Sequence, residues 1–211
     1  MPKVGMQPIR RQQLIKAAFD VIVVNGVEDA TMAAVANAAG MSTGIVSHYF
    51  GSKDGLLEAA MRQVLRDLRD AVATHRAQAK SDDPRAHLRA IVDGNFDPSQ
   101  TNPTAMRVWL SFWAASRHKP ELARLQRAND RRLHSNLAYQ FSRLIPRADA
   151  RDAATGLAAM IDGLWLRGSL SNQLFDPMLM IEPPPAVIMS GATVWMAKNM
   201  WRRLVAWRSS Q

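Results

Sequence analysis

The sequence predicts an all-α protein. Apolar side chains recur at helical spacing, capping residues, glycines and prolines separate the periodic runs, and no run alternates like a half-buried strand. The first run, Ile9 to Val24, has one apolar face, made of Leu14, Ala17, Ala18, Val21 and Ile22. Asn25 and Gly26 follow and are expected to end this helix, because both residue types favour helix C-termini.

Two short helices are expected next. Thr31 is a suitable N-cap for a helix over residues 32–39, and Gly40 should stop it. Ser42 is a suitable N-cap for the following helix, which should end near Phe50.

The spacing within these two helices is typical of a helix-turn-helix. Ala36 supplies a small residue where the helices cross, Gly40 permits a left-handed turn, and Val46 supplies a buried aliphatic side chain. The second helix of such a pair is left exposed and fits a DNA groove.

The rest of the chain also predicts helices. Ser52 should cap a long helix from Lys53 to about Gln78. Further helices are expected over residues 84–95, 103–117, 119–144 and 149–170.

Composition limits the class of protein. A chain of 211 residues fits a small head with a larger body. Cysteine is absent, so a disulfide framework and cysteine-ligated metals are excluded. The first residues lack the apolar run of a signal peptide, and the most apolar late stretch, Ala186 to Ala197, is shorter than the roughly 20 residues that span a bilayer. We therefore expect a soluble cytoplasmic protein without a membrane partner.

The formal charge of +9 favours a polyanionic partner. Four cations and no acid lie in the first turns, at Lys3, Arg10, Arg11 and Lys16. Such a basic arm would contact phosphates and make binding to DNA weaken with salt.

The exposed helix of the pair should present groups that hydrogen-bond phosphates and base edges. These groups belong to Ser42, Thr43, Ser47, His48 and Tyr49. Lys53 lies in the first turn of the next helix, where the helix dipole opposes a cation, so a nearby phosphate would explain it. The alternative interpretation is an ordinary helical corner with solvated polar side chains.

The string "TMAAVANAAGMSTGIVSHYFGSKDGLL" resembles the DNA-binding domain of the TetR family of transcriptional repressors. The matching residues are Thr31, Ala36, Ala39, Gly40, Ser42, Gly44, Tyr49, Phe50, Ser52, Lys53, Leu56 and Leu57. The resemblance implies a TetR-like fold, with a three-helix DNA-binding domain over 1–52 and a ligand-binding and dimerisation domain over 53–211. It implies a homodimer on a double-stranded operator. The candidate DNA-binding residues are Lys3, Arg10, Arg11, Thr31, Ser42, Thr43, Gly44, Ser47, His48, Tyr49 and Lys53.

A narrower resemblance is to the choline-responsive, BetI-type repressors of glycine betaine synthesis. It rests on "GIVSHYF", whose tyrosine comes two residues after the position that many family members fill with tyrosine, and on "SDDPRAHLRAIVDGNFDPSQ" and "LAAMIDGLWLRG". It extends from residue 1 to about 177. It implies choline as the effector, no cofactor and a role in osmotic stress, with another ligand, such as a lipophilic cation, as the alternative.

A sensor of choline must hold a quaternary ammonium, which has no N–H to donate and is held by aromatic faces, sometimes with a carboxylate. The candidate ligand-binding residues are Phe96, Trp109, Phe112, Trp113, Asn136, Tyr139, Asp162 and Trp165. Trp109 and Trp113 share one helix face, and Asp162 and Trp165 share another. The alternative is that the aromatic residues belong to the core and that Asp162 pairs with an arginine such as Arg167.

No catalytic or metal motif stands out. The histidines, at positions 48, 75, 87, 118 and 134, lack metal-ligand spacing, and there is no phosphate loop or dinucleotide fingerprint. We therefore expect no enzyme and no metal. An enzyme with an accessory DNA-binding head and a non-repressing architectural protein are the rival classes.

The tail departs from the family pattern. After about residue 177 the chain carries Pro183-Pro184-Pro185, several tryptophans and four cations, with no acid after Glu182. BetI-type proteins usually continue with an acidic amphipathic helix, so we consider a change of reading frame near Pro177, with genuine divergence as the alternative. In either case, dimerisation through the last two helices is less secure here.

Overall fold

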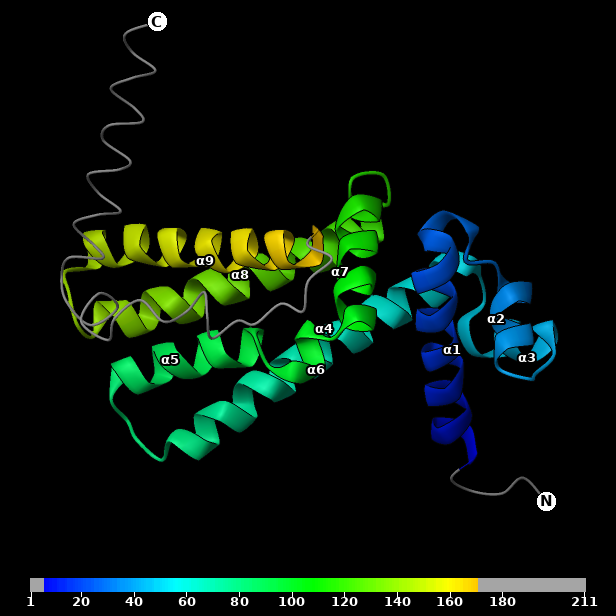
Figure 1. The fold of residues 1–211 in the computed structure, drawn as a ribbon, viewed down its shortest axis with the longest axis horizontal. Coiled ribbons are helices and arrows are strands. Elements are labelled where there is room, and N and C mark those ends of the chain that lie inside the picture. Colours follow the sequence, from blue (N-terminus) through cyan, green and yellow to red (C-terminus); the bar gives the residue numbers. More distant parts are fainter. Residues whose placement is uncertain (1–5, 171–211) are drawn as a thin grey trace, which may run out of the picture. The chain divides into compact units, whose positions relative to one another are not determined.

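The computed structural model describes residues 6–170 (Figure 1). Every regular element in that range is an α-helix, which confirms the predicted fold class. The helices are α1 (Met6–Asp29), α2 (Met32–Ala38), α3 (Thr43–Phe50), α4 (Lys53–Ala79), α5 (Pro84–Asn95), α6 (Pro98–Thr101), α7 (Pro103–Ser116), α8 (Pro120–Ser142) and α9 (Arg147–Leu170).

The chain divides into two compact units. The first combines Met1–Asp70 with Pro98–Asn129, and the second combines Ala71–Asp97 with Asp130–Gln211. Helices α4 and α8 each contribute to both units. The boundary predicted after residue 52 divides the chain by expected role, DNA binding before it and ligand binding after it. The two units divide the chain by packing, so they do not test that boundary, which stays a prediction.

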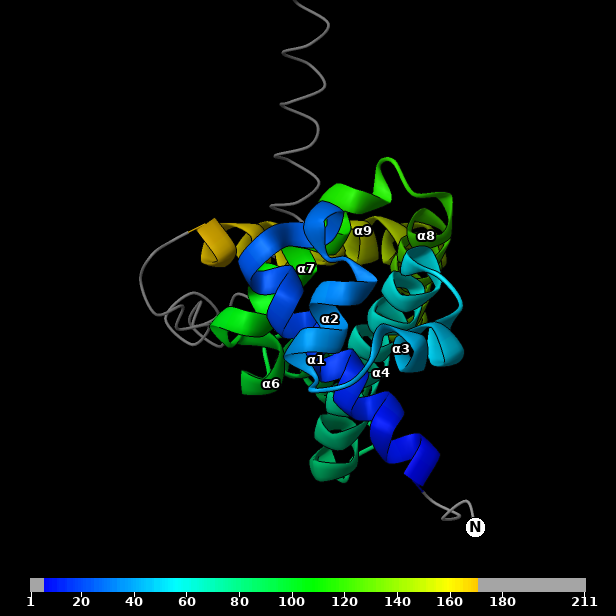
Figure 2. The same cartoon turned by 90° about the vertical axis from the view of Figure 1, so that its right-hand side faces the viewer.

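In the first unit, α1 packs against α2 and against α7, while α2 packs against α3. The three N-terminal helices lie together in two perpendicular views (Figures 1 and 2). The fully buried side chains of this unit include Leu14, Ile22, Val35, Val46, Leu56, Met61 and Phe112. The three N-terminal helices therefore share one core with α4 and α7.

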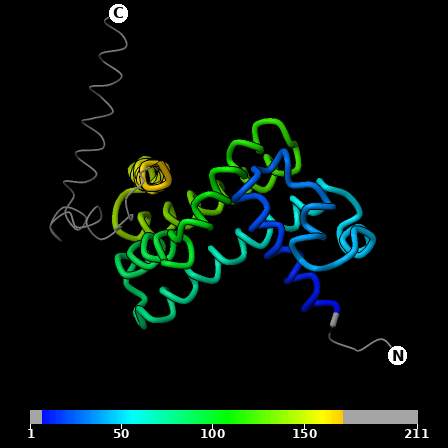
Figure 3. The backbone as a smooth tube through the Cα atoms, turned by 45° about the vertical axis from the view of Figure 1, so that its right-hand side comes forward, coloured from blue at the N-terminus to red at the C-terminus, as the bar shows by residue number. Residues whose placement is uncertain are grey.

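In the second unit, α4, α5, α8 and α9 enclose a core around Ile91, Leu137 and Ala154. Figure 3 looks almost along the axis of α9, the yellow to orange helix. Gly94 of α5 lies directly against α4, because a Cβ atom at Gly94 would be 2.5 Å from the Cα atom of Val72. The absence of a side chain at this position is what lets the two backbones approach so closely.

The predicted helix starts are confirmed by the caps. The side-chain oxygens of Thr31, Ser42 and Ser52 accept hydrogen bonds from the backbone N–H groups of Ala34, Ile45 and Gly55. Two details differ from the prediction. Gly26 has a φ of 79° and interrupts α1, but helical backbone resumes up to Asp29. The four-residue α6 was not predicted, because it is too short to show a period.

Candidate DNA-contacting helix and effector sites

The turn between α2 and α3 is built by local chemistry. Gly40 adopts a φ of 64°, a left-handed conformation that costs glycine little. The N–H of Met41 donates to the carbonyl oxygen of Ala36 over 2.9 Å, which closes the end of α2. Ser42, in extended backbone, then starts α3 in a new direction.

Helix α3 has one buried side and one exposed side. Val46 is fully buried and holds α3 to the rest of its unit. The exposed residues of the segment are Ser42, Thr43, Gly44, Ser47 and His48. The polar side of α3 therefore faces outward, as the sequence predicts, and what it contacts there stays a prediction.

Aromatic side chains close the C-terminal end of α3. The ring of Tyr49 meets His48 edge-on, with centroids 5.5 Å apart, and lies 6.3 Å from the ring of Phe50. The guanidinium carbon of Arg11 is 5.5 Å from the centroid of Phe50, which is a cation–π geometry. Arg11 therefore joins α1 to α3, while Arg10 is exposed. Lys3 lies outside the described residues.

Lys53 has a protein partner that explains its position. Its ammonium group donates to the backbone carbonyl oxygen of Glu28, at the end of α1. This contact is one reason for a cation in the first turn of α4, and a phosphate contact of Lys53 stays a prediction. Thr31, likewise, caps α2 with its exposed side chain.

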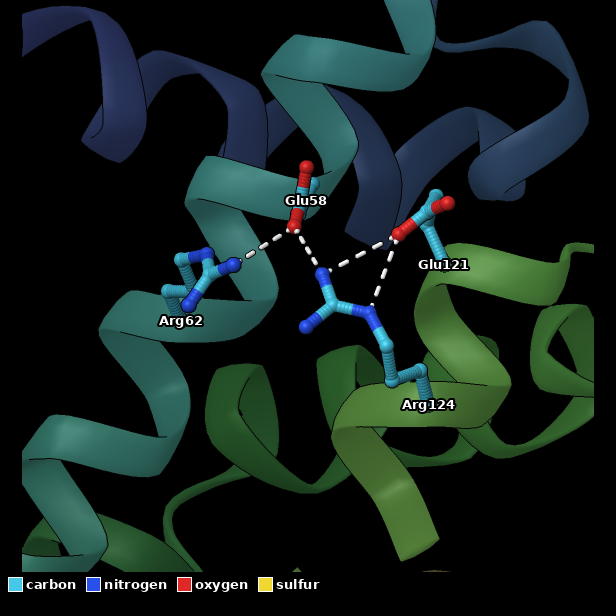
Figure 4. Close-up of polar contacts among 4 residues, drawn as sticks. All are labelled: Glu58, Arg62, Glu121 and Arg124. Carbon is cyan, nitrogen blue, oxygen red and sulfur yellow. Dashed lines mark hydrogen bonds and ion pairs between the residues drawn. The ribbon is translucent and has the colours of Figure 1, made fainter. Parts of the chain in front are cut away.

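The first turns of α4 are also joined to the start of α8 (Figure 4). Glu58 accepts hydrogen bonds from Arg62 and Arg124, over 2.7 and 2.9 Å, and Arg124 also pairs with Glu121 at 3.0 Å. These ion pairs are at the surface, so each contributes about 1 kcal/mol or less and is weakened by salt. They connect α4 to α8 shortly after the end of α3.

Three candidate ligand residues lie on α7. Trp109 and Trp113 are neighbours, with ring centroids 6.2 Å apart and planes tilted by 56°. Phe112 is fully buried, so its faces are covered by protein. The indole N–H of Trp109 donates to Gln100 over 3.4 Å.

Five further candidates lie in the second unit. Trp165 and Phe96 are buried, and the indole N–H of Trp165 donates over 3.0 Å to the carbonyl oxygen of Asn95, next to Phe96. Asn136 and Tyr139 are exposed on α8. The predicted cage draws on both units, and its assembly stays a prediction.

Asp162 is accessible to water in α9, yet crowded by protein atoms. Burial of the carboxylate raises the pKa of Asp162 to about 6, and the negative charge of Asp130 contributes in the same direction. None of the ion pairs in residues 6–170 involves Asp162, so the predicted alternative pairing with Arg167 is not formed.

A cleft in the first unit adds residues that the sequence did not single out. It lies between α1, α4, α6 and α7, and its volume is about 200 Å³. It is lined by Phe19, Val64, Asp67, Ser99, Gln100, Asn102, Thr104, Ala105, Val108 and Trp109. Trp109 is the predicted ligand residue among them. Asp67 carries no recognisable sequence signal, because it looks like any acid on a polar helix face.

In the described range, no cluster of histidine and carboxylate side chains has the arrangement of a metal site. None of the helices in that range is long and apolar enough to cross a bilayer.

The chain matches two family models. Residues 14–60 match the model of bacterial regulatory proteins of the tetR family, and residues 84–182 match that of the BetI-type transcriptional repressor, C-terminal. The HTH-type transcriptional regulator BetI of Stenotrophomonas maltophilia is 68% identical over 83% of this chain and 89% of its own length. BetI 1 of Chromohalobacter salexigens is 62% identical over 83% of this chain and 87% of its own length.

The fold has counterparts among solved structures. A putative transcriptional regulator from Pseudomonas aeruginosa PAO1 superposes with a TM-score of 0.69 at 24% identity, covering 95% of this chain and 92% of its own. Together with the capped, outward-facing α3, the family matches define a DNA-binding regulator, and the chain belongs to the TetR family. Within that family it is a BetI-type transcriptional repressor and not an enzyme.

Proposed function

We propose that this repressor controls the genes that convert choline to glycine betaine and that choline is its effector. It acts in the cytoplasm as a homodimer on a pseudo-palindromic operator, with one α3 in each of two major grooves about one DNA turn apart. The observation that supports DNA binding best is the exposed polar side of α3, held in place by the buried Val46. The choice of genes and of effector rests on the resemblance to the choline-responsive, BetI-type repressors, and the similarity to proteins named BetI agrees with it.

The DNA-binding step is tested on α3. Ser47→Ala and His48→Ala each remove an exposed hydrogen-bonding group and leave the buried side intact. Each should weaken operator binding about tenfold, in line with the loss of one base or phosphate contact. Ser135→Ala, on the exposed surface of α8, is the matched control. Unchanged binding by both α3 variants would remove the helix from the interface.

The effector step is tested by titrating choline into the wild-type protein and following tryptophan fluorescence. Glycine betaine and a neutral carbon isostere of choline are the controls for the cation. Choline alters operator binding only to the extent that it binds one conformer better than the other. If neither tryptophan emission nor operator affinity responds to choline, another ligand, such as a lipophilic cation, takes its place.

The homodimer has a suitable surface on α9. Six small or apolar residues of α9 are exposed along one side of the helix, namely Gly156, Ala159, Met160, Gly163, Leu166 and Leu170. A Cβ atom at Gly163 would meet nothing within 4 Å, so there is open space along this side for a partner helix. The second helix expected for the interface, and the proposed change of reading frame near Pro177, lie outside the described residues.

A further inference from the structure

The cleft between α1, α4, α6 and α7 lies wholly within the first unit. Its volume of about 200 Å³ is below the roughly 300–1,000 Å³ that drug-sized ligands occupy, so it suits a small ligand. Half-buried Phe19 comes from α1 and buried Trp109 from α7, so the two aromatic side chains reach the cleft from different helices.

The cleft contains one carboxylate, that of Asp67 on α4. Its hydrogen-bond donor is the neutral side-chain amide of Gln63, over 2.7 Å. The guanidinium of Arg66, the nearest cation in sequence, donates instead to the amide oxygen of Gln63 over 2.6 Å. No ion pair within the described range involves Asp67, so the positive charge of Arg66 acts on it without direct contact.

Burial raises the pKa of Asp67 above its ordinary value, and the charge of Asp70 adds to this, while the Gln63 hydrogen bond and the charge of Arg66 act in the opposite direction. The side chain of Asp67 is exposed, although protein atoms crowd part of it, and Arg66 offsets its charge without an ion pair. A cation bound in the cleft would therefore stabilise this carboxylate further.

The neighbouring side chains fix the aromatic wall. Gln100 is buried and accepts the indole N–H of Trp109 over 3.4 Å, which holds the ring in one orientation. An indole beside a carboxylate is a favourable setting for a quaternary ammonium, because the ring quadrupole attracts a cation that cannot donate a classical hydrogen bond.

We propose that this cleft is a binding site for a small ammonium cation, with Asp67 as the counter-ion and with Trp109 and Phe19 as its aromatic walls. Where the ligand is choline, the inference rests on the proposed function. The site is distinct from Asp162 and Trp165, which lie in the other unit.

The position of the cleft gives it a route to the DNA-binding helices. Phe19 belongs to α1, which packs against both α2 and α7. A cation held between Phe19 and Trp109 contacts α1 and α7 together, so it favours the conformer in which these helices have the spacing that the ligand requires. A change in the spacing of α1 and α7 would also move α2 and α3, because α2 packs against α1 and α3 packs against α2.

The test measures binding of choline and of tetramethylammonium to the full chain by isothermal titration calorimetry. Asp67→Asn removes the charge and keeps the shape. Asp54→Asn is the control on the same helix, because this carboxylate pairs with Lys119 at 3.0 Å and does not line the cleft. Asp162→Asn tests the other candidate carboxylate, and thermal unfolding verifies that each variant is folded.

The expected result is that the wild type binds both cations, that Asp67→Asn weakens each at least about tenfold, and that the other two variants bind like the wild type. If Asp67→Asn binds both cations as tightly as the wild type, the cleft is not the binding site. The proposal that choline is the effector is unaffected by that result. Binding of tetramethylammonium that depends on Asp67, without binding of choline, supports the cleft and contradicts the proposed effector. If the wild type binds neither cation, both the proposed cation site and choline as the effector are wrong.

Discussion

At the residue scale, Gly44 is a position where the fold tolerates a side chain but a close approach of DNA would not. It lies in the first turn of α3, is exposed, and a Cβ atom there would meet only the Oγ atom of Ser42 at an ordinary 3.8 Å. The protein itself therefore does not require glycine at this position. A close approach of the DNA backbone to α3 would require it.

We therefore predict that Gly44→Ala separates stability from operator binding. Alanine should raise the free energy of unfolding by up to about 1 kcal/mol, because it is the better helix former. Operator affinity should fall about tenfold, because the new methyl group occupies space that a phosphate needs. Chemical denaturation and fluorescence anisotropy measure the two effects. Unchanged operator affinity would show that DNA does not approach this side of the turn.

Asp162 gives a prediction on pH. Its pKa of about 6 in the folded protein is above the ordinary 3.8, so the folded state binds the extra proton between these values. The contribution of this group to stability is therefore lost as the pH rises from about 4 through 6. The amide in Asp162→Asn does not titrate, so this variant does not lose stability as the pH rises through this range. Its melting temperature should exceed that of the wild type above pH 6, and the difference should vanish near pH 4.

Thermal unfolding across this pH range measures the difference, with Asp152→Asn on the same helix as the control. A difference between Asp162→Asn and the wild type that is the same at every pH would mean that titration of this carboxylate is not its cause.

At the element scale, the contact between α4 and α5 depends on Gly94. A Cβ atom there would lie 2.5 Å from the Cα atom, 2.7 Å from the N atom and 2.6 Å from the Cγ2 atom of Val72. Gly94→Ala should therefore force the helices apart and destabilise the protein by about 1–3 kcal/mol or more, measured by urea denaturation.

The double variant with Val72→Ala is the informative companion. It removes the Cγ2 atom, but two of the three clashing atoms belong to the backbone and remain. The double variant should therefore not recover the stability of Val72→Ala alone. If the double variant is as stable as Val72→Ala alone, the Val72 side chain, and not the backbone of α4, is what excludes a Cβ atom at Gly94.

Helix positions could be predicted from the sequence because their signals are local. Thr31, Ser42 and Ser52 cap their helices through hydrogen bonds that span only three residues. The resumption of helix after Gly26 could not be predicted in this way. It coincides with a contact from Lys53, 25 residues further along the chain, to the carbonyl oxygen of Glu28.

At the scale of the whole molecule, the candidate effector residues show where sequence reasoning ends. The pairing of Trp109 with Trp113 follows from helical spacing and is confirmed. The contact of Trp165 with Asn95 spans 70 residues and has no local signal. Asp67 shares the cleft with Trp109 only because α4 and α7 pack in one unit. Tertiary packing, and not periodicity, brings this aromatic residue and this carboxylate to the same cleft.

The proposed homodimer gives the last prediction. Met160 is 48% exposed and lies within the apolar side of α9. In a two-fold interface each residue of the patch faces the same patch of the partner, so one new charge appears twice at close range. Met160→Arg should therefore yield monomers in sedimentation experiments, whereas Ser135→Arg, at an exposed polar position of α8, should leave the dimer intact.

Operator binding should fall with the dimer. Two linked heads bind a palindrome at a high effective concentration, which raises affinity by about 10²–10⁴-fold over one head. A monomeric Met160→Arg should lose an affinity factor in that range for the full operator, yet bind a half-site like the wild type. If it remains a dimer with full operator affinity, the subunits meet elsewhere.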